Sequence, residues 1–308
     1  MDPDKIQKSS KFWDNNIRIH EEKQNYIHWM DSPLVQEFCL KKLPLGNNKI
    51  PAPQWIAWFK EKYVRTPFCY GLSLGCGDGT LERYAVQNKI CERIDSFDNS
   101  KNSIKIAKQL CKNNNLEQYI RYEQKDINEI KLEKNKYDVI FIGAAAHHFE
   151  NLEHIFFELK NGLKPNGLLV INEFIGPTQF QWDEKQLKIM NDLLDLLPKS
   201  LKMDKTTNKI KTKIHKPTIE AMNALDPSEA IRSSEIVPVL TKYFRIIERI
   251  DYGGTILHLL LYGIIDNFAS SDEKDICILK MLGYFEDLLI SEKILSSDFT
   301  IIVAKNDK

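Results

Sequence analysis

The sequence lacks any long apolar run, and this absence argues against a membrane-spanning protein. No stretch approaches the roughly 20 apolar residues that cross a bilayer, and the opening Met1-Asp2-Pro3-Asp4-Lys5 has no apolar signal-peptide segment. We therefore expect a soluble, cytoplasmic protein without a membrane span. At 308 residues the chain is long enough for one α/β catalytic domain with additions.

The chain also lacks an excess of one charge and a cluster of metal ligands. Basic and acidic residues number 43 each, and this balance disfavours a nucleic-acid partner. The cysteines are scattered, with no C-x-x-C pair and no histidine at ligand spacing: Cys39, Cys69, Cys76, Cys91, Cys111 and Cys277. The sequence therefore predicts reduced thiols and no metal site, and removing divalent ions with EDTA is expected to leave activity unchanged.

Glycine is concentrated in one stretch, Tyr70 to Arg83, where an apolar run meets Gly75, Gly77 and Gly79 and then a helical pattern. Glycines let the backbone approach a ligand closely, and the start of a helix leaves N–H groups free. The G-x-G-x-G spacing differs from the G-x-G-x-x-G of dinucleotide sites, and no P-loop lysine follows. A nucleotide-sized ligand without phosphates is therefore predicted.

Two carboxylates follow at the ends of the next two predicted strands. Asp98 lies about 20 residues beyond the glycines, where a strand-end carboxylate can accept hydrogen bonds from both ribose hydroxyls of an adenosine. Asp126 ends the following strand and is placed to meet an adenine amino group. These positions indicate that the ligand carries an adenosine.

Strand and helix patterns alternate from Phe68 to Gly176, which predicts parallel strands joined by right-handed crossovers. The predicted fold is α/β, a Rossmann-like doubly wound sheet of seven strands that ends in an antiparallel pair. The expected strands lie near 71–74, 93–97, 120–124, 139–142, 168–172, 244–250 and 299–304, with helices near 80–87, 103–113, 152–163, 257–268 and 275–291. Gly75, Asp98, Asp126, Gly143 and Glu173 then all fall at carboxyl ends of strands, where such sheets bind ligands.

The pattern divides the chain into four parts: an N-terminal helical cap at 1–66, the ligand-binding core at 67–176, a helical lid or acceptor-binding insertion at 177–238, and completion of the sheet with inserted helices at 239–308. In the cap, prolines are expected to break the chain into short helices, at Pro33, Pro44, Pro51 and Pro53. Four tryptophans either pack there or line an acceptor pocket, with packing favoured: Trp13, Trp29, Trp55 and Trp58.

Taken together, the glycine turn, Asp98, Asp126 and the strand Tyr137 to Ile142 resemble the successive motifs of class I S-adenosylmethionine-dependent methyltransferases. The resemblance implies S-adenosylmethionine (SAM) as cofactor and S-adenosylhomocysteine (SAH) as product. It implies cofactor contacts from Leu74, Gly75, Cys76, Gly77, Gly79, Asp98, Asn99, Asp126, Ile127, Gly143 and Ala144. One departure is Ser73, where that class usually has a carboxylate.

A narrower resemblance extends over nearly the whole chain from about Trp29. It is carried by the segments 72–77 with 81–83, 172–177 with 180–182, 226–233 and 252–258. These segments are similar to a bacterial group of methyltransferase-domain proteins that are often encoded beside or fused to glycosyltransferases. That group does not define the acceptor, and we expect a small-molecule or sugar-containing one.

Methyl transfer from a sulfonium mainly requires that nucleophile, methyl carbon and sulfur lie in line. A hydroxyl nucleophile also needs a base. The candidates are His148, then His147, just past the fourth strand, and Glu173 at the end of the fifth. The alternative is that the histidines pack without moving protons.

Four more residues are candidates for acceptor contacts: Trp182, Arg232, Tyr252 and His258. Arg232 either binds an anionic group or pairs with Glu229 or Glu235 on a helix that starts at Asp226 and Pro227. Trp182 either stacks on a sugar or holds the lid in place.

The favoured function is O-methylation of a small-molecule or glycan-type acceptor. N-methylation is the alternative within the enzyme class, and a SAM-binding module without catalysis is the alternative outside it. A nicotinamide oxidoreductase is disfavoured by the glycine spacing. The sequence does not define an oligomeric state.

Overall fold

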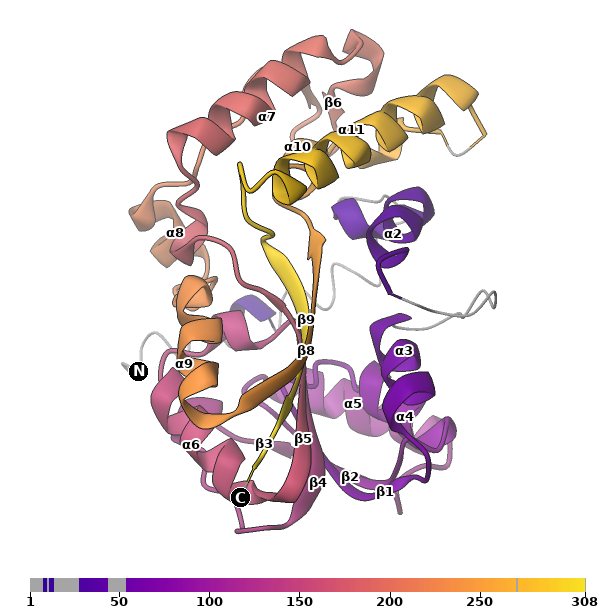
Figure 1. The fold of residues 1–308 in the computed structure, drawn as a ribbon, viewed down its shortest axis with the longest axis vertical. Helices are drawn as coiled ribbons and strands as arrows, with labels where there is room; N and C mark the ends of the chain where they lie inside the picture. The colour runs from indigo at the N-terminus through magenta and orange to yellow at the C-terminus, as the bar shows by residue number, and fades with distance from the viewer. Residues whose placement is uncertain (1–7, 10, 14–27, 44–53, 270, 308) are drawn as a thin grey trace.

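A computed structural model of the chain describes residues 8, 9, 11–13, 28–43, 54–269 and 271–307. A central twisted sheet is flanked by helices on both faces, and a second group of helices lies beyond one end of the sheet (Figure 1). The helix breaks predicted at Pro44, Pro51 and Pro53 lie outside the described residues. Among the described residues, no helix combines the length and apolar character that a membrane crossing requires.

The seven-stranded sheet has the order β3-β2-β1-β4-β5-β9-β8. Its strands are β1 (Phe68–Leu74), β2 (Cys91–Asp98), β3 (Ile120–Gln124), β4 (Tyr137–Gly143), β5 (Leu163–Phe174), β8 (Arg245–Gly253) and β9 (Phe299–Lys305). The first five pair in parallel, and β9 pairs antiparallel with both β5 and β8. The predicted doubly wound fold with a closing antiparallel pair is confirmed.

The chain contains ten α-helices with described bounds: α2 (Pro33–Leu40), α3 (Gln54–Tyr63), α4 (Thr80–Gln87), α5 (Lys101–Asn113), α6 (Leu152–Gly162), α7 (Glu184–Leu196), α8 (Ile219–Leu225), α9 (Ile236–Tyr243), α10 (Leu257–Leu261) and α11 (Glu273–Ser291). Short 3-10 helices lie at η1 (Trp29–Asp31), η2 (Ile127–Glu129), η3 (Ala146–His148), η4 (Thr178–Phe180), η5 (Lys199–Leu201), η6 (Ser233–Glu235) and η7 (Ile265–Asn267). A two-stranded hairpin of β6 (Met203–Asp204) and β7 (Lys209–Ile210) was not predicted.

Successive side chains of the central strands point to alternate sides of the sheet, so the sheet has two separate hydrophobic faces. In β4, Val139 and Phe141 join the core cluster that contains residues of α3, α4 and α5, whereas Ile140 and Ile142 join the cluster that contains residues of α6 and α9. Successive side chains of a strand point to opposite faces, and parallel strands covered on both faces are apolar throughout. The uninterrupted apolar run in β4 is therefore explained by helices on both sides.

One helix expected from the sequence does not form where it was predicted. Asp226 was expected to cap the N-terminus of a helix with Pro227 at its first position, but Asp226 instead follows the last residue of α8. Its Oδ1 accepts hydrogen bonds from the N–H and the hydroxyl of Ser228, at 2.9 and 2.7 Å. Asp226 therefore begins a turn, and the prediction of a helix at this position is wrong.

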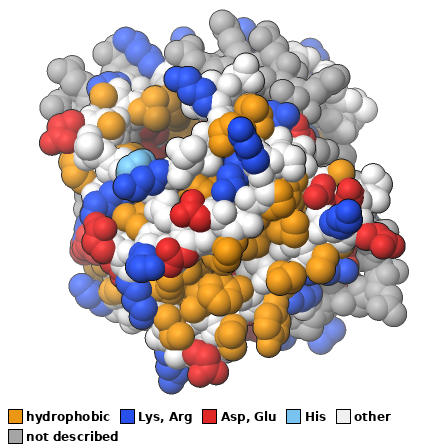
Figure 2. All heavy atoms as spheres, turned by 90° about the horizontal axis from the view of Figure 1, so that it is seen from above, with side chains coloured by type: hydrophobic (Ala, Val, Ile, Leu, Met, Phe, Trp, Pro, Cys, Tyr) orange, Lys and Arg blue, Asp and Glu red, His pale blue; other side chains and the backbone are white. Residues whose placement is uncertain are grey.

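The helices beyond the sheet come from the two insertions, after β5 and after β8, and from the N-terminal part of the chain, where α2 packs beside α11 (Figure 1). In the view from above, hydrophobic side chains on this part of the surface lie among charged ones (Figure 2). On α11 the exposed apolar side chains include Met281 and Tyr284, which are 66% and 68% exposed. Nothing in the sheet requires these side chains, which fits the prediction that this segment is an addition to the minimal fold.

A buried carboxylate joins α11 to the end of β8. The side chain of Glu286 is 0% exposed and accepts hydrogen bonds from the N–H groups of Gly254, Ile256 and Leu257 at 2.8, 2.6 and 2.9 Å. Burial raises the pKa of Glu286 above its usual value. Those N–H groups lie at the start of α10, where a helix has no internal acceptors for them.

We expect Glu286→Ala to lower the free energy of unfolding by about 3 kcal/mol or more, because three buried N–H groups lose their acceptor. Urea unfolding followed by circular dichroism measures this change. The exposed Glu292 at the end of α11 provides a control, and Glu292→Ala should change stability by about 0.5 kcal/mol or less. Equal effects of the two substitutions would contradict this account of Glu286.

Candidate functional site

The glycine turn between β1 and α4 is held in a conformation that its glycines make possible. Gly75, Gly77 and Gly79 have φ values of +68°, +53° and +80°, in the left-handed region that side chains disfavour. A Cβ on Gly75 would lie 2.3 Å from the Cβ of Ala145, whereas a Cβ on Gly77 would meet nothing within 4 Å. Gly75 therefore permits close packing of two loops, and Gly77 leaves open space.

Asp98 joins this turn to the end of β2. Its Oδ2 accepts a hydrogen bond from the N–H of Gly77 at 2.9 Å, and its Oδ1 accepts one from the N–H of Ser100 at 2.8 Å. A carboxylate oxygen can accept more than one hydrogen bond. The side chain thus fixes the glycine turn against the end of β2 and also lines the cavity, where the sequence predicts a ribose contact.

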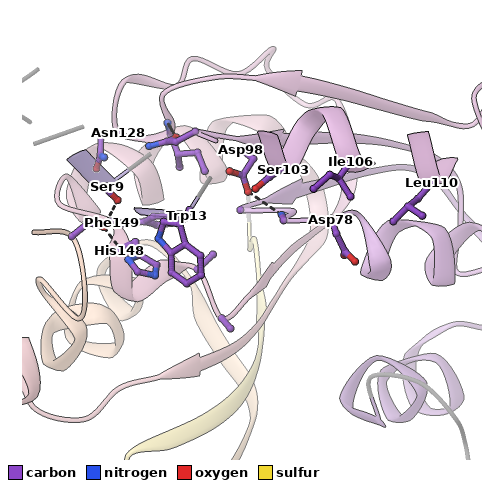
Figure 3. Close-up of a pocket in the computed structure, with 17 residues that line it drawn as sticks. Ser9, Trp13, Asp78, Asp98, Ser103, Ile106, Leu110, Asn128, His148 and Phe149 are labelled. Carbon is purple, nitrogen blue, oxygen red and sulfur yellow. Dashed lines mark hydrogen bonds between the residues drawn. The ribbon is translucent and has the colours of Figure 1, made fainter. Parts of the chain in front are cut away.

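A cavity of about 490 Å³ lies at the carboxyl ends of β1, β2 and β4. Asp78, Ile106 and Leu110 lie toward one end of it, and Trp13, His148 and Ser9 toward the other, with Asp98 between them (Figure 3). This volume is within the range of small-molecule sites. The cavity follows the edge of the sheet where parallel α/β folds bind ligands.

The cavity contains seven of the residues predicted from the sequence: Gly75, Gly77, Asp98, Asn99, Ile127, Ala144 and His148. Leu74, Cys76, Gly79, Asp126 and Gly143 adjoin these residues in the chain without lining the cavity. Asp126 accepts a hydrogen bond from the N–H of Asn128 at the start of η2. The lining residues that sequence reasoning missed include Ser9, Asp78, Ser103, Ile106, Leu110, Asn128, Phe149 and Ser228.

The chain turns sharply after β4, and a buried carboxylate from β5 fixes the turn. Ala144 has a φ of +51°, and the N–H groups of Ala145 and Ala146 then donate to Oε2 of Glu173 at 2.8 and 2.5 Å. Oε1 of Glu173 accepts from its neighbour Phe174 N–H and bonds Nδ1 of His147. At 1% exposure, Glu173 has both oxygens engaged, and this geometry supports a positioning role rather than proton transfer to an acceptor.

The two adjacent histidines have different environments. Burial disfavours the charged form of His147, but the Glu173 carboxylate raises the pKa of His147 above its usual value. Burial also disfavours the charged form of Glu173, but His147 and the backbone N–H groups hold the pKa of Glu173 below its usual value. Burial and the neighbouring His147 lower the pKa of His148. Of the two, His148 also lines the cavity. The structure therefore separates an ion-paired His147 from a His148 that faces the ligand space.

His148 is held by contacts from the N-terminal segment and from the turn after α8. Its Nδ1 lies 3.0 Å from Oγ of Ser228, and its ring packs edge-on against Trp13 with the ring centroids 5.2 Å apart. Trp13 in turn donates from Nε1 to Asp226 at 3.1 Å. Trp13 thus lines the cavity, whereas Trp29, Trp55 and Trp58 are buried in the core. The packing interpretation fits three of the four tryptophans.

A third acidic side chain lies beside the two histidines. Oε1 of Glu229 lies 3.7 Å from Nε2 of His147, and Oε2 of Glu229 lies 3.8 Å from Nε2 of His148. This position of Glu229 could not be predicted from local sequence patterns, because the contact requires the turn after α8 to reach back to η3. Among the described residues, this trio is a group of side chains that is suited to hold a metal ion.

The four predicted acceptor contacts lie outside this cavity. Arg232 forms ion pairs with Glu153 at 2.7 Å and with Glu235 at 2.6 Å. The pair with Glu235 is one of the two pairings that the sequence suggested for Arg232. Trp182 is 2% exposed and donates to Asp298, and Tyr252 is 5% exposed and donates to Asn172. His258 lies in an aromatic cluster where burial lowers its pKa to about 3. All four side chains take part in packing, hydrogen bonds or ion pairs, and their contacts with an acceptor stay predictions.

Residues 72–171 match the family described as "Methyltransferase domain". The malonyl-[acyl-carrier protein] O-methyltransferase of Halalkalibacterium halodurans is 33% identical over 141 residues, which are 42% of this chain and 51% of that protein. Malonyl-[acyl-carrier protein] O-methyltransferase 2 of Ilyobacter polytropus is 30% identical over 122 residues, 40% of this chain and 46% of that protein. The chain thus spans about half the length of the curated relatives it matches.

Solved structures share the fold over nearly the whole chain. A Galdieria sulphuraria protein described as a "putative sarcosine dimethylglycine methyltransferase" has a TM-score of 0.54 at 16% identity, covering 96% of this chain and 99% of that one. A geranyl diphosphate methyltransferase in complex with GPP and sinefungin has a TM-score of 0.55 at 12% identity and covers 98% of each chain. The family match thus shows a methyltransferase domain over residues 72–171, and the strand order and the solved structures show that the chain has the Rossmann-like fold of class I methyltransferases.

Proposed function

We propose that the chain is a SAM-dependent methyltransferase that transfers the methyl group to an oxygen of a small-molecule acceptor. The observation that carries this proposal is that Asp98, Gly77 and His148 line one cavity at the carboxyl edge of the sheet. The relatives from H. halodurans and I. polytropus are O-methyltransferases, which favours oxygen over nitrogen.

In the proposed complex the adenosine of SAM lies along the edge of the sheet. Its ribose hydroxyls donate to Asp98, and its backbone contacts come from the turn at Gly75 and Gly77. The methionine end then extends past Ala144 toward His148. The small side chains of Ala144 and Ala145 leave room for the sulfonium at that end. Transfer follows when an acceptor oxygen lies in line with the methyl carbon and the sulfur.

The acceptor oxygen must lose its proton as the new bond forms. His148 is the titratable cavity residue at that end, and its lowered pKa leaves the imidazole neutral near pH 7. We assign His148 the role of acting on the acceptor hydroxyl, whereas Glu173 orients η3 through His147 and two N–H groups. Formation of SAH with candidate sugars and small metabolites tests the activity, because a binding module without catalysis would bind SAM without turnover.

Asp98→Ala is expected to weaken SAM binding about tenfold to a hundredfold, because charge-assisted hydrogen bonds to the ribose are lost. Isothermal titration calorimetry with SAM and SAH measures this effect. Glu129→Ala, which removes an exposed carboxylate near the same edge of the sheet, is the control and should leave Kd unchanged. Unchanged affinity in Asp98→Ala would remove the ribose contact from the account.

Gly77→Ala should chiefly weaken ligand binding, whereas Gly75→Ala should chiefly destabilise the fold. Each substitution places a side chain at positive φ, at a cost of about 1–2 kcal/mol. The added methyl of Gly77→Ala enters open space beside the cavity and should raise the Kd for SAM about tenfold, since it obstructs close approach of the ligand. Gly75→Ala also collides with Ala145 and should lower the free energy of unfolding by roughly 1–3 kcal/mol more than Gly77→Ala does. Calorimetry and urea unfolding of both variants check the contrast, which equal unfolding free energies would contradict.

His148→Ala should lower kcat about a hundredfold or more while leaving the Kd for SAM within about twofold, because the side chain acts on the acceptor rather than on the adenosine. Steady-state assays of SAH release measure kcat once an acceptor is found. His215→Ala replaces an exposed histidine and provides the control. A kcat near that of the unmodified protein would exclude His148 from the chemistry.

A further inference from the structure

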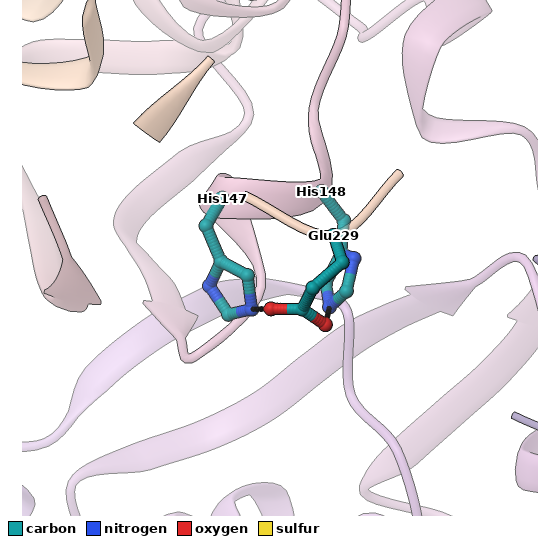
Figure 4. Close-up of side chains that lie close together, drawn as sticks. All are labelled: His147, His148 and Glu229. Carbon is teal, nitrogen blue, oxygen red and sulfur yellow. Dashed lines mark ion pairs between the residues drawn. The ribbon is translucent and has the colours of Figure 1, made fainter. Parts of the chain in front are cut away.

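Three side chains from two distant segments converge on one small gap beside the cavity. His147 and His148 lie on either side of the Glu229 carboxylate, each with Nε2 facing a different oxygen (Figure 4). The separations of 3.7 and 3.8 Å exceed those of a hydrogen bond. The three groups therefore face one another without bonding directly.

Each imidazole is oriented through its other nitrogen. Nδ1 of His147 bonds Glu173, and Nδ1 of His148 lies 3.0 Å from the hydroxyl of Ser228. This arrangement leaves both Nε2 atoms to face Glu229. Histidines that ligate metals commonly have one ring nitrogen held by a carboxylate or another polar group, which fixes the ring and its tautomer.

The backbone around the trio is also fixed. The N–H of Ile231 donates to the carbonyl of His147 at 3.0 Å, and Gln179 donates to the carbonyl of Ala230 at 2.7 Å. The turn that carries Glu229 is further held by Asp226, whose carboxylate binds the N–H and hydroxyl of Ser228. Two loops are therefore joined so that their ligand atoms are already close before any ion binds.

We propose that Nε2 of His147, Nε2 of His148 and the carboxylate of Glu229 bind one divalent transition-metal ion of the zinc, manganese or iron(II) class. Two imidazoles and one carboxylate suit such ions better than magnesium or calcium, which prefer oxygen ligands. Ligand atoms bound at about 2.1 Å from a shared ion lie about 3–4 Å apart, which matches the observed separations. This proposal replaces the expectation from the sequence that no metal site is present.

Three protein ligands leave coordination positions open, as in metal sites that act on a substrate. The side chains of His147, His148 and Glu229 are 12%, 17% and 23% exposed, so solvent and small molecules reach the ion. Resting on the proposed function, we assign the open position to the acceptor hydroxyl. With the ion bound, His148 acts on this hydroxyl as a ligand of the ion and not as the base that takes its proton. The hydroxyl proton is lost to solvent, the O–CH₃ bond forms as the S–CH₃ bond breaks, and the sulfur keeps the electron pair of that bond.

The proposal is tested by measuring metal binding to the full chain, without an activity assay. Protein stripped with a chelator is titrated with Zn²⁺ and with Mn²⁺ by calorimetry, and metal content after dialysis is read by mass spectrometry. We expect one ion per chain. Glu229→Gln and His148→Gln should each weaken binding at least tenfold, whereas the exposed controls Glu220→Gln and His215→Ala should retain one ion.

Binding of neither ion at stoichiometric level would overturn the proposal, as would an ion that Glu229→Gln retains with unchanged affinity. Circular dichroism of each variant establishes that the fold is kept. Titration with SAM in the same calorimeter tests the proposed function separately from the metal site. Protein that binds SAM but no metal contradicts the metal site alone, and protein that binds metal but no SAM contradicts the proposed function.

Discussion

The hydrogen bond between the Asp98 carboxylate and the N–H of Gly77 is the constraint on which the site depends. It joins the end of β2 to the turn after β1, so the two ends of the strands present one continuous surface to a ligand. Parallel pairing of β1 and β2 brings these ends together, because Leu74 lies opposite Phe97 in the register. The pairing of the strands therefore positions the half of the site where we propose that the adenosine binds.

The other half of the site depends on a second buried carboxylate. Glu173 at the end of β5 binds two successive N–H groups after β4 and one ring of the histidine pair. Because β4 and β5 are neighbours in the sheet, this contact holds η3 against the cavity in one orientation. The turn after α8 then adds Ser228 and Glu229 from an insertion. The proposed binding half thus comes from the sheet and its turns, whereas the proposed chemical half also uses a segment inserted after β5.

The parts of this structure that sequence could predict are those set by local patterns. The bounds of α4 and β3 agree with the expected ranges, because helical spacing and the strand-length apolar pattern are visible within a few residues. Asp98 and the glycines were found by their spacing along the chain. Trp182 and Tyr252 are buried and His258 is half-buried, all outside the cavity, and an aromatic residue near a turn gives no local sign in the sequence of such packing. Glu229 was missed as a partner of His147 because only the tertiary path of an insertion brings them together.

The central claim is that an adenosine-bearing sulfonium lies across the carboxyl edge of the sheet, with its sugar on Asp98 and its methyl group toward His148. A crystal structure of the protein grown with SAH tests it most directly. We predict density in the cavity with both ribose hydroxyls on the Asp98 carboxylate and the sulfur on the His148 side. Density for SAH elsewhere on the protein, or in the cavity with the ribose away from Asp98, would contradict it.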